Sequence, residues 1–157
     1  MGFFSKFKKE APTLVAVADG DVIAMDAVSD PVFASKSMGD GFAVEPSSST
    51  VVSPVNGVIK SIFPTQHAII LQSDDGLDIL VHMGLETVAL KGEGFDVKVA
   101  KGDKVTAGQP MAIMDLGYVV EQGKKTTIIV VITNLEDKRL KLTTGRASAG
   151  SAVVEVK

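Results

Sequence analysis

The chain has 157 residues, of which 45% are hydrophobic and 22% are charged, a composition that fits one globular domain with its own core. Sixteen Lys and Arg against nineteen Asp and Glu give a net charge of −3, which argues against nucleic acid as a partner. The absence of cysteine excludes a disulfide framework, a thiolate metal site and a cysteine nucleophile, and it fits a reducing compartment. We therefore expect a cytoplasmic protein whose chemistry uses other side chains.

The first ten residues combine three phenylalanines with three lysines. This composition is typical of a flexible basic and aromatic tail, and also of a short amphipathic anchor that makes weak peripheral contact with a membrane. The lysines interrupt the apolar residues, so no secretory signal is expected. No apolar run reaches the roughly 20 residues that a membrane-spanning helix needs. We therefore divide the sequence into a tail at 1–10 and a single domain at 11–157.

From Ala11 onward, short runs rich in β-formers alternate with Gly, Pro, Asp and Ser turns every eight to twelve residues or so, roughly the spacing of a sandwich or barrel. This pattern predicts an all-β, single-domain antiparallel β-sandwich or barrel with at most short helical turns. In chain order the expected strands are 14–17, 21–25, 41–45, 51–52, 57–63, 68–72, 78–81, 96–99, 109–115, 127–133 and 152–156. Helical turns are expected only at 87–90 and 116–124, and two glycines weaken the second.

The runs at 68–72 and 78–81 predict a β-hairpin, because a polar segment with a glycine separates them. With a two-residue or four-residue loop, facing residues have numbers that sum to 149, so His67 and His82 would lie directly opposite each other. A three-residue loop would shift this register by one residue. These are the only histidines in the chain, so the expected register brings both imidazoles together on one face of the sheet.

Two adjacent imidazoles admit three interpretations. One ring could accept a phosphoryl group while the other donates a hydrogen bond to the phosphoryl oxygens. The pair His67 and His82 could instead bind zinc, although two histidines fill only half of a tetrahedral shell. The third interpretation is a pair of structural histidines. Nearby, the Thr65 hydroxyl could orient His67, and Gly84 would allow a backbone or ligand to approach closely.

Two motifs around the histidines resemble the glucose-family enzyme IIA domains of the bacterial phosphoenolpyruvate-dependent sugar phosphotransferase system. The first runs from Gly76 through His82-Met-Gly84 to Phe95, and the second from 53–57 to Thr65-Gln-His67-Ala. The segments 30–34 and 39–41 are also similar to this family, so the resemblance extends from about residue 14 to the C-terminus. It implies an antiparallel β-sandwich or barrel that requires no cofactor.

The resemblance implies a phosphocarrier. A phosphoryl group would come from the phosphohistidine of the carrier HPr and leave to a cysteine in the IIB domain of a glucose-type sugar permease. His82 would carry the group on its outer ring nitrogen, and His67 would stabilise it. Thr65 would orient His67, and the carbonyl of Gly84 would hold the other nitrogen of His82.

Partners of this family dock on an apolar surface with an acidic rim, and seven positions of the sequence match it. They are the apolar Val32, Phe33, Met38, Phe63 and Leu80 and the acidic Asp30 and Glu86. The carrier would also regulate permeases and kinases according to its phosphorylation state. Two alternatives remain: a regulatory binding protein on the same scaffold that carries no phosphoryl group, and a zinc endopeptidase, for which two histidines supply too few ligands.

Overall fold

The computed structural model describes residues 11–157, which form three antiparallel sheets. In chain order the strands are β1 (Thr13–Val15), β2 (Gly20–Ala24), β3 (Asp40–Pro46), β4 (Thr50–Val52), β5 (Gly57–Ile62), β6 (Ala68–Ser73), β7 (Asp78–Leu85), β8 (Phe95–Val97), β9 (Lys104–Val105), β10 (Pro110–Met114), β11 (Lys125–Ile132), β12 (Leu140–Leu142), β13 (Gly145–Ala147) and β14 (Ala152–Val156). The helical segments are η1 (Met25–Ala27), α2 (Pro31–Ala34), η2 (Thr87–Leu90) and α3 (Leu116–Glu121). The prediction of an all-β antiparallel fold with short helical turns is confirmed.

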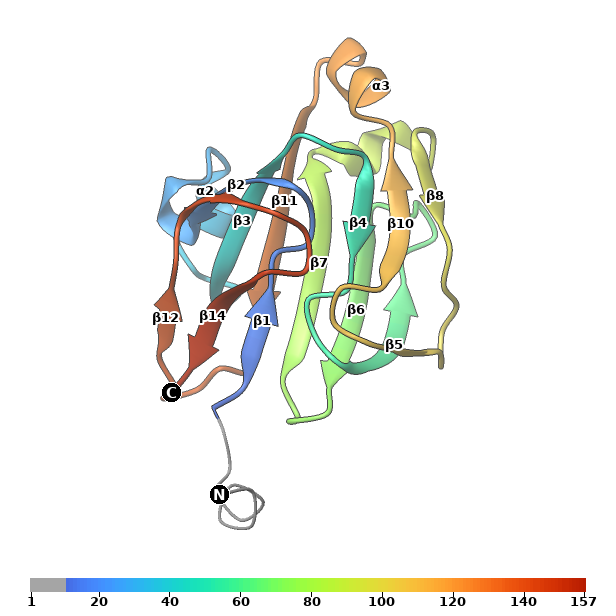
Figure 1. The fold of residues 1–157 in the computed structure, drawn as a ribbon. Helices are drawn as coiled ribbons and strands as arrows, with labels where there is room; N and C mark the ends of the chain where they lie inside the picture. Colours follow the sequence, from blue (N-terminus) through green and yellow to red (C-terminus); the bar gives the residue numbers. More distant parts are fainter. Residues whose placement is uncertain (1–10) are drawn as a thin grey trace.

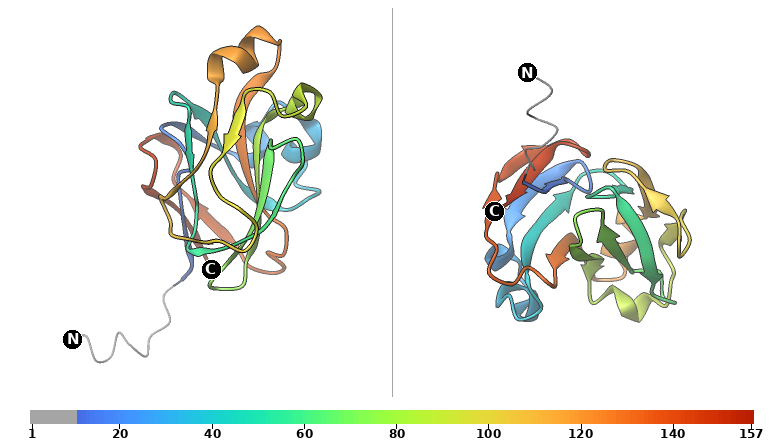
Figure 2. Two further views of the ribbon diagram at one scale, coloured as in Figure 1. Left: turned by 90° about the vertical axis from the view of Figure 1, so that its right-hand side faces the viewer. Right: turned by 90° about the horizontal axis from the view of Figure 1, so that it is seen from below.

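The strands form a sandwich of one large sheet and two small ones. The large sheet has the order β13-β2-β3-β11-β7-β6-β5-β9, and the small sheets have the orders β1-β14-β12 and β4-β10-β8. Both small sheets lie in front of the long strands of the large sheet (Figure 1). The segments α2 and η2 lie on the opposite side of the large sheet (Figure 2). The large sheet therefore has an inner face toward the small sheets and an outer face toward α2 and η2.

The main core fills the space between the large sheet and the small sheets. Ile69, Val81 and Val130 occupy one row across β6, β7 and β11, and all three are fully buried on the inner face. The small sheets contribute Leu14 and Met111, which are fully buried as well. Because side chains alternate between the two faces of a strand, the neighbours of these residues point to the outer face.

A second, smaller apolar cluster covers the outer face. Ala68, Leu80 and Ile129 from the large sheet pack there with Met25 of η1 and Phe33 of α2. The centre of the large sheet is therefore apolar on both faces. This arrangement explains the uninterrupted apolar run at 128–132, which a strand with one solvated face would not show.

Several elements differ from the expected ones. β7 continues past the predicted end at residue 81 to Leu85, and β9, β12, β13 and α2 had no predicted counterpart. The helix α2 has only four residues, too few to show helical periodicity. Its start is nevertheless encoded, because the Asp30 carboxylate accepts a hydrogen bond from the Val32 N–H at 2.9 Å and Pro31 occupies the first helical position. The predicted helical turns at 87–90 and 116–124 are confirmed as η2 and α3.

No helix within residues 11–157 is long and apolar enough to cross a bilayer. The predicted basic and aromatic tail, with its membrane contact, falls at residues 1–10 and lies outside the described residues.

Candidate functional site

The hairpin that carries the histidines has a register different from the predicted one. His82 pairs with Ala68, so facing residues sum to 150, and the prediction of direct opposition to His67 is wrong by one residue. The loop has three residues, 74–76, because the Ser73 N–H donates to the Leu77 carbonyl and Gly76 adopts a φ of 87°. In a regular strand with this register, the side chain of His67 would point to the face opposite that of His82.

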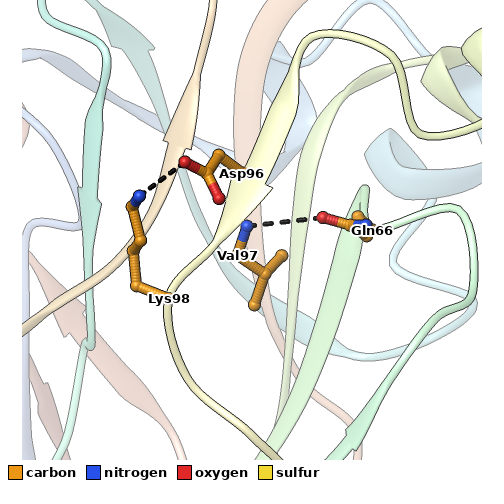
Figure 3. A network of polar contacts seen from close by, with 4 residues as sticks. All are labelled: Gln66, Asp96, Val97 and Lys98. Carbon is orange, nitrogen blue, oxygen red and sulfur yellow. Dashed lines mark hydrogen bonds and ion pairs between the residues drawn. The ribbon is translucent and has the colours of Figure 1, made fainter.

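A turn before β6 brings the two imidazoles together in spite of this register. Gln66, directly before His67, has a left-handed backbone with a φ of 58°, so the regular alternation of the strand begins only after it. The two rings lie with their centroids 4.9 Å apart and their planes at 82°. The Gln66 side chain accepts a hydrogen bond from the backbone N–H of Val97 at 3.4 Å, beside the ion pair between Asp96 and Lys98 (Figure 3). This contact ties the turn to the small sheet that contains β8.

The hydrogen bond of His82 assigns different roles to its two ring nitrogens. Nδ1 lies 2.8 Å from the carbonyl oxygen of Gly84. A carbonyl only accepts, so Nδ1 holds the proton, and Nε2 keeps its lone pair when the ring is neutral. Burial lowers the pKa of His82, and this effect outweighs the opposing effects of the Gly84 carbonyl and the Asp30 carboxylate. The ring is therefore neutral at neutral pH, with an unprotonated Nε2.

Position 84 requires a glycine for two reasons: its backbone is left-handed, and a side chain would not fit there. Its φ is 81°, and a Cβ at this position would lie 2.4 Å from Cγ2 of Thr87 and 2.8 Å from the carbonyl oxygen of Lys125. The pairing of β7 with β11 shifts register here, between Lys125 and Ile128. Such an irregularity re-aims backbone groups, and in this case the Gly84 carbonyl turns back toward the ring of His82.

His67 is more deeply buried than its partner, with 3% of its surface exposed. Its Nδ1 lies 2.7 Å from the Thr65 hydroxyl. Burial, and then the proximity of His82, lower the pKa of His67 to about 4, so the ring is neutral. When Thr65 donates to Nδ1, the ring proton resides on Nε2 and is available to an anion. The ring of Phe63 meets that of His67 edge-on, with centroids 5.5 Å apart.

The predicted apolar docking residues divide into two groups. The exposed ones are Val32, Met38 and Phe63, at 56%, 40% and 37% of their surface. Phe33 and Leu80 are buried instead, as members of the outer-face cluster, and the centroid of the Phe33 ring lies 5.1 Å from that of His82. Val88 in η2, which sequence reasoning missed, is 54% exposed.

The predicted acidic rim residues lie close to each other. Asp30 and Glu86 line the same surface hollow, together with Lys124 and Lys125. Asp30 has a second function, since it caps α2. The rim therefore contains positive as well as negative charges.

The zinc site remains a prediction. Within residues 11–157, no group of three or more His, Cys, Asp or Glu side chains is placed to hold a metal ion. His67 and His82 alone would supply two ligands, so a bound zinc ion would need further ligands from another molecule or from water. The endopeptidase alternative lacks its third protein ligand among these residues.

Two residues that support the site were missed by sequence reasoning. Thr87 lies in the first motif and begins the predicted helical turn at 87–90, but no role was predicted for its side chain. That side chain is fully buried and donates its hydroxyl to the Met83 carbonyl at 2.6 Å. The only signal in the sequence for this contact is the position of a threonine three residues after Gly84. Gln66 has none, because a left-handed backbone in a residue other than glycine leaves no mark in the sequence.

Comparisons with known proteins agree with the fold. The family model described as phosphoenolpyruvate-dependent sugar phosphotransferase system, EIIA 1, matches residues 12–138. The chain is 41% identical to the glucose-specific EIIA component of Buchnera aphidicola, over 98% of this chain and 97% of that protein. The solved structure of glucose permease IIA from Mycoplasma capricolum superposes with a TM-score of 0.88 at 36% identity, covering 94% of this chain and 96% of that one.

Some relatives are much longer. The glucose-specific EIICBA component of Streptococcus pneumoniae is 48% identical over 96% of this chain, and the chain spans only 21% of that relative's length. The fold and the comparisons together place the chain among the IIA components of sugar phosphotransferase systems. The chain belongs to the EIIA 1 family of the phosphoenolpyruvate-dependent system, which confirms the resemblance found in the sequence.

Proposed function

We propose that the chain works in the cytoplasm as a glucose-type phosphocarrier that accepts a phosphoryl group on Nε2 of His82 from HPr and passes it to a cysteine of a IIB domain. The observation that carries this proposal is the 2.8 Å hydrogen bond from Nδ1 of His82 to the Gly84 carbonyl. It leaves Nε2 as a free nucleophile beside the neutral ring of His67. No cysteine is present in this chain, so the next acceptor belongs to another domain or protein.

Transfer needs one bond to form and one to break. The lone pair of Nε2 of His82 attacks phosphorus, the N–P bond of the donor phosphohistidine breaks, and its electron pair returns to the donor ring. The proton on Nδ1 stays in its hydrogen bond, where the Gly84 carbonyl stabilises the positive charge that the ring develops. His67 donates a hydrogen bond from Nε2 to a phosphoryl oxygen. In the second transfer a thiolate attacks phosphorus and the electron pair returns to Nε2 of His82.

Incubation with phosphoenolpyruvate, enzyme I and HPr tests the proposal. We expect intact-mass spectrometry to show one acid-labile phosphoryl group per chain, and we expect none in His82→Ala. His67→Ala keeps its nucleophile, so it should accept the group but pass it to IIB more slowly, by about 10-fold or more. Retention of the label in His82→Ala would disprove the carrier assignment. Normal transfer by His67→Ala would remove His67 from the mechanism.

A regulatory role alongside the carrier role is favoured by the exposed apolar side chains of Val32, Phe63 and Val88. A phosphoryl group on His82 would add about two negative charges beside the adjacent apolar surface, which would change what docks there. Pull-downs of permeases and kinases with phosphorylated and unphosphorylated protein test this role. Capture that is independent of phosphorylation would contradict a phosphorylation-dependent switch.

A further inference from the structure

Thr87 is a buried polar residue beside the site that has no assigned function. It begins η2, and none of its surface is exposed. Its hydroxyl donates to the Met83 carbonyl at 2.6 Å and so closes the chain segment 83–87 into a loop. Gly84 lies inside this loop, where an added Cβ would meet Cγ2 of Thr87 at 2.4 Å and Oγ1 at 3.2 Å. The Thr87 side chain therefore packs directly on Gly84.

Gly84 needs such a support because regular strand pairing does not hold it. On the β11 side, Met83 pairs with Ile128 and Leu85 pairs with Lys125. Gly84, which lies between them, has no partner in β11. On the other side of β7, the pairing with β6 ends at His82. The orientation of the Gly84 carbonyl thus depends on contacts outside the ladders.

The backbone of Met83 links Thr87 to both histidines. The Met83 carbonyl accepts a hydrogen bond from the Thr87 hydroxyl, and the Met83 N–H donates one to the His67 carbonyl at 2.7 Å. Met83 also lies between His82 and Gly84, whose side chain and carbonyl form the hydrogen bond that fixes Nδ1. A shift of the Met83 carbonyl would therefore move the Gly84 carbonyl relative to the ring.

We infer that Thr87 is a positioning residue for phosphoryl transfer: its hydroxyl fixes the backbone of Met83 and Gly84 so that the Gly84 carbonyl keeps the ring proton of His82 on Nδ1. The effect of Thr87 on phosphoryl transfer rests on the proposed function. Its effect on the position of the His82 ring proton does not, because that position is a property of the free protein. Without the hydroxyl, the carbonyl moves and the proton also populates Nε2, which blocks the nucleophile.

The test compares Thr87→Val, which keeps the shape but removes the donor, with Thr87→Ser, which keeps the donor. Ring ¹⁵N chemical shifts of His82 report which nitrogen holds the proton. We expect Thr87→Val to populate the Nε2–H form and to lower kcat for phosphoryl acceptance about tenfold with KM for HPr unchanged, because the docking surface is untouched. Thr87→Ser should retain the wild-type ring shifts.

Ser53→Ala is the matched control for loss of a buried hydroxyl. Ser53 is also fully buried, and it donates to the Val55 carbonyl at 2.7 Å in the turn between β4 and β5. Unchanged His82 shifts in Thr87→Val, altered shifts in Thr87→Ser, or equal losses of kcat in Thr87→Val and Ser53→Ala would each overturn the inference. If Thr87→Val does not fold, Thr87→Ala removes the same donor, and the same comparison of its ring shifts with those of Thr87→Ser decides. If the wild type does not accept a phosphoryl group from HPr, the proposed function is contradicted. The ring shifts of the unphosphorylated protein still test whether Thr87 fixes the proton of His82.

Discussion

The two histidines differ in the kind of group that holds each ring. The Gly84 carbonyl can only accept a hydrogen bond, so the tautomer of His82 is fixed. The Thr65 hydroxyl can donate or accept, so either ring nitrogen of His67 can hold the proton. Sequence analysis predicted that the rings would meet, but their unequal roles came only from the family resemblance. The chemistry of the two partners now supplies a physical reason for that assignment.

The low pKa of His67 predicts a specific pH dependence of stability. Its pKa is about 4 in the folded protein against an ordinary value of 6.5, so between these values the unfolded chain binds more protons and acid favours unfolding. The contribution is fully present above pH 6.5 and is lost as pH falls to 4, with a loss of roughly 3 kcal/mol.

Urea unfolding at pH 7 and pH 4 measures this effect. From pH 7 to pH 4 the free energy of unfolding should fall in both proteins. We expect the fall to be smaller in His67→Gln than in the wild type, and the difference between the two falls to be roughly 3 kcal/mol. Gln72→Ala, an exposed position in β6, the strand that directly follows His67, should follow the wild type. Parallel profiles for the wild type and His67→Gln would show that His67 is not held neutral by burial.

At the level of elements, the hairpin shows what sequence patterns can and cannot predict. The apolar runs identified β6 and the start of β7, because alternation and turn residues are local signals. The register depended on whether the loop has two, three or four residues, and the sequence 73–76 admits all three. The helix α2 was missed for a related reason, since one turn has no periodicity, although the pair Asp30-Pro31 is a cap signal.

Gly84 and Gly76 form a matched pair for testing how the end of β7 is built. Their φ values are 81° and 87°, but a Cβ at Gly76 would meet nothing within 4 Å, whereas one at Gly84 would collide with Thr87 and Lys125. We expect Gly76→Ala to cost about 1 kcal/mol for the backbone conformation alone. Gly84→Ala should cost about 3 kcal/mol and abolish phosphoryl acceptance. Thermal unfolding measures the difference in stability between the two variants. Equal losses of stability would contradict the close packing at Gly84.

For the whole molecule, the fold depends on pairing between the two ends of the described chain. β14 lies between β1 and β12, so the C-terminal strand completes a sheet that begins with the N-terminal one. Likewise, β13 pairs with β2 at the edge of the large sheet. Such distant pairings are invisible to local patterns, which is why the sequence predicted most strands of the sandwich but not their order, and missed the short β9, β12 and β13.

Two neighbouring positions in β14 test this dependence. Val154 is 2% exposed and faces Leu14 in β1 and Leu142 in β12, while Glu155 is exposed to solvent. Val154→Asp should destabilise the entire domain by about 3 kcal/mol or more, because it buries a charge in the main core. Glu155→Ala should change stability by less than about 1 kcal/mol. Denaturant unfolding followed by circular dichroism measures both. A Val154→Asp variant as stable as Glu155→Ala would show that the domain does not need this strand.

The alternation of β6, β7 and β11 between two apolar clusters has an evolutionary consequence. Along each strand, one set of side chains packs the main core and the intervening set packs the outer-face cluster, whose Phe33 lies against His82. Substitutions in the outer-face cluster can therefore alter the packing beneath α2 while the main core stays intact. An insertion or deletion of one residue within these strands would exchange the two sets and destroy both at once. We expect homologues to diverge at these strands by replacement and to change length only in the loops.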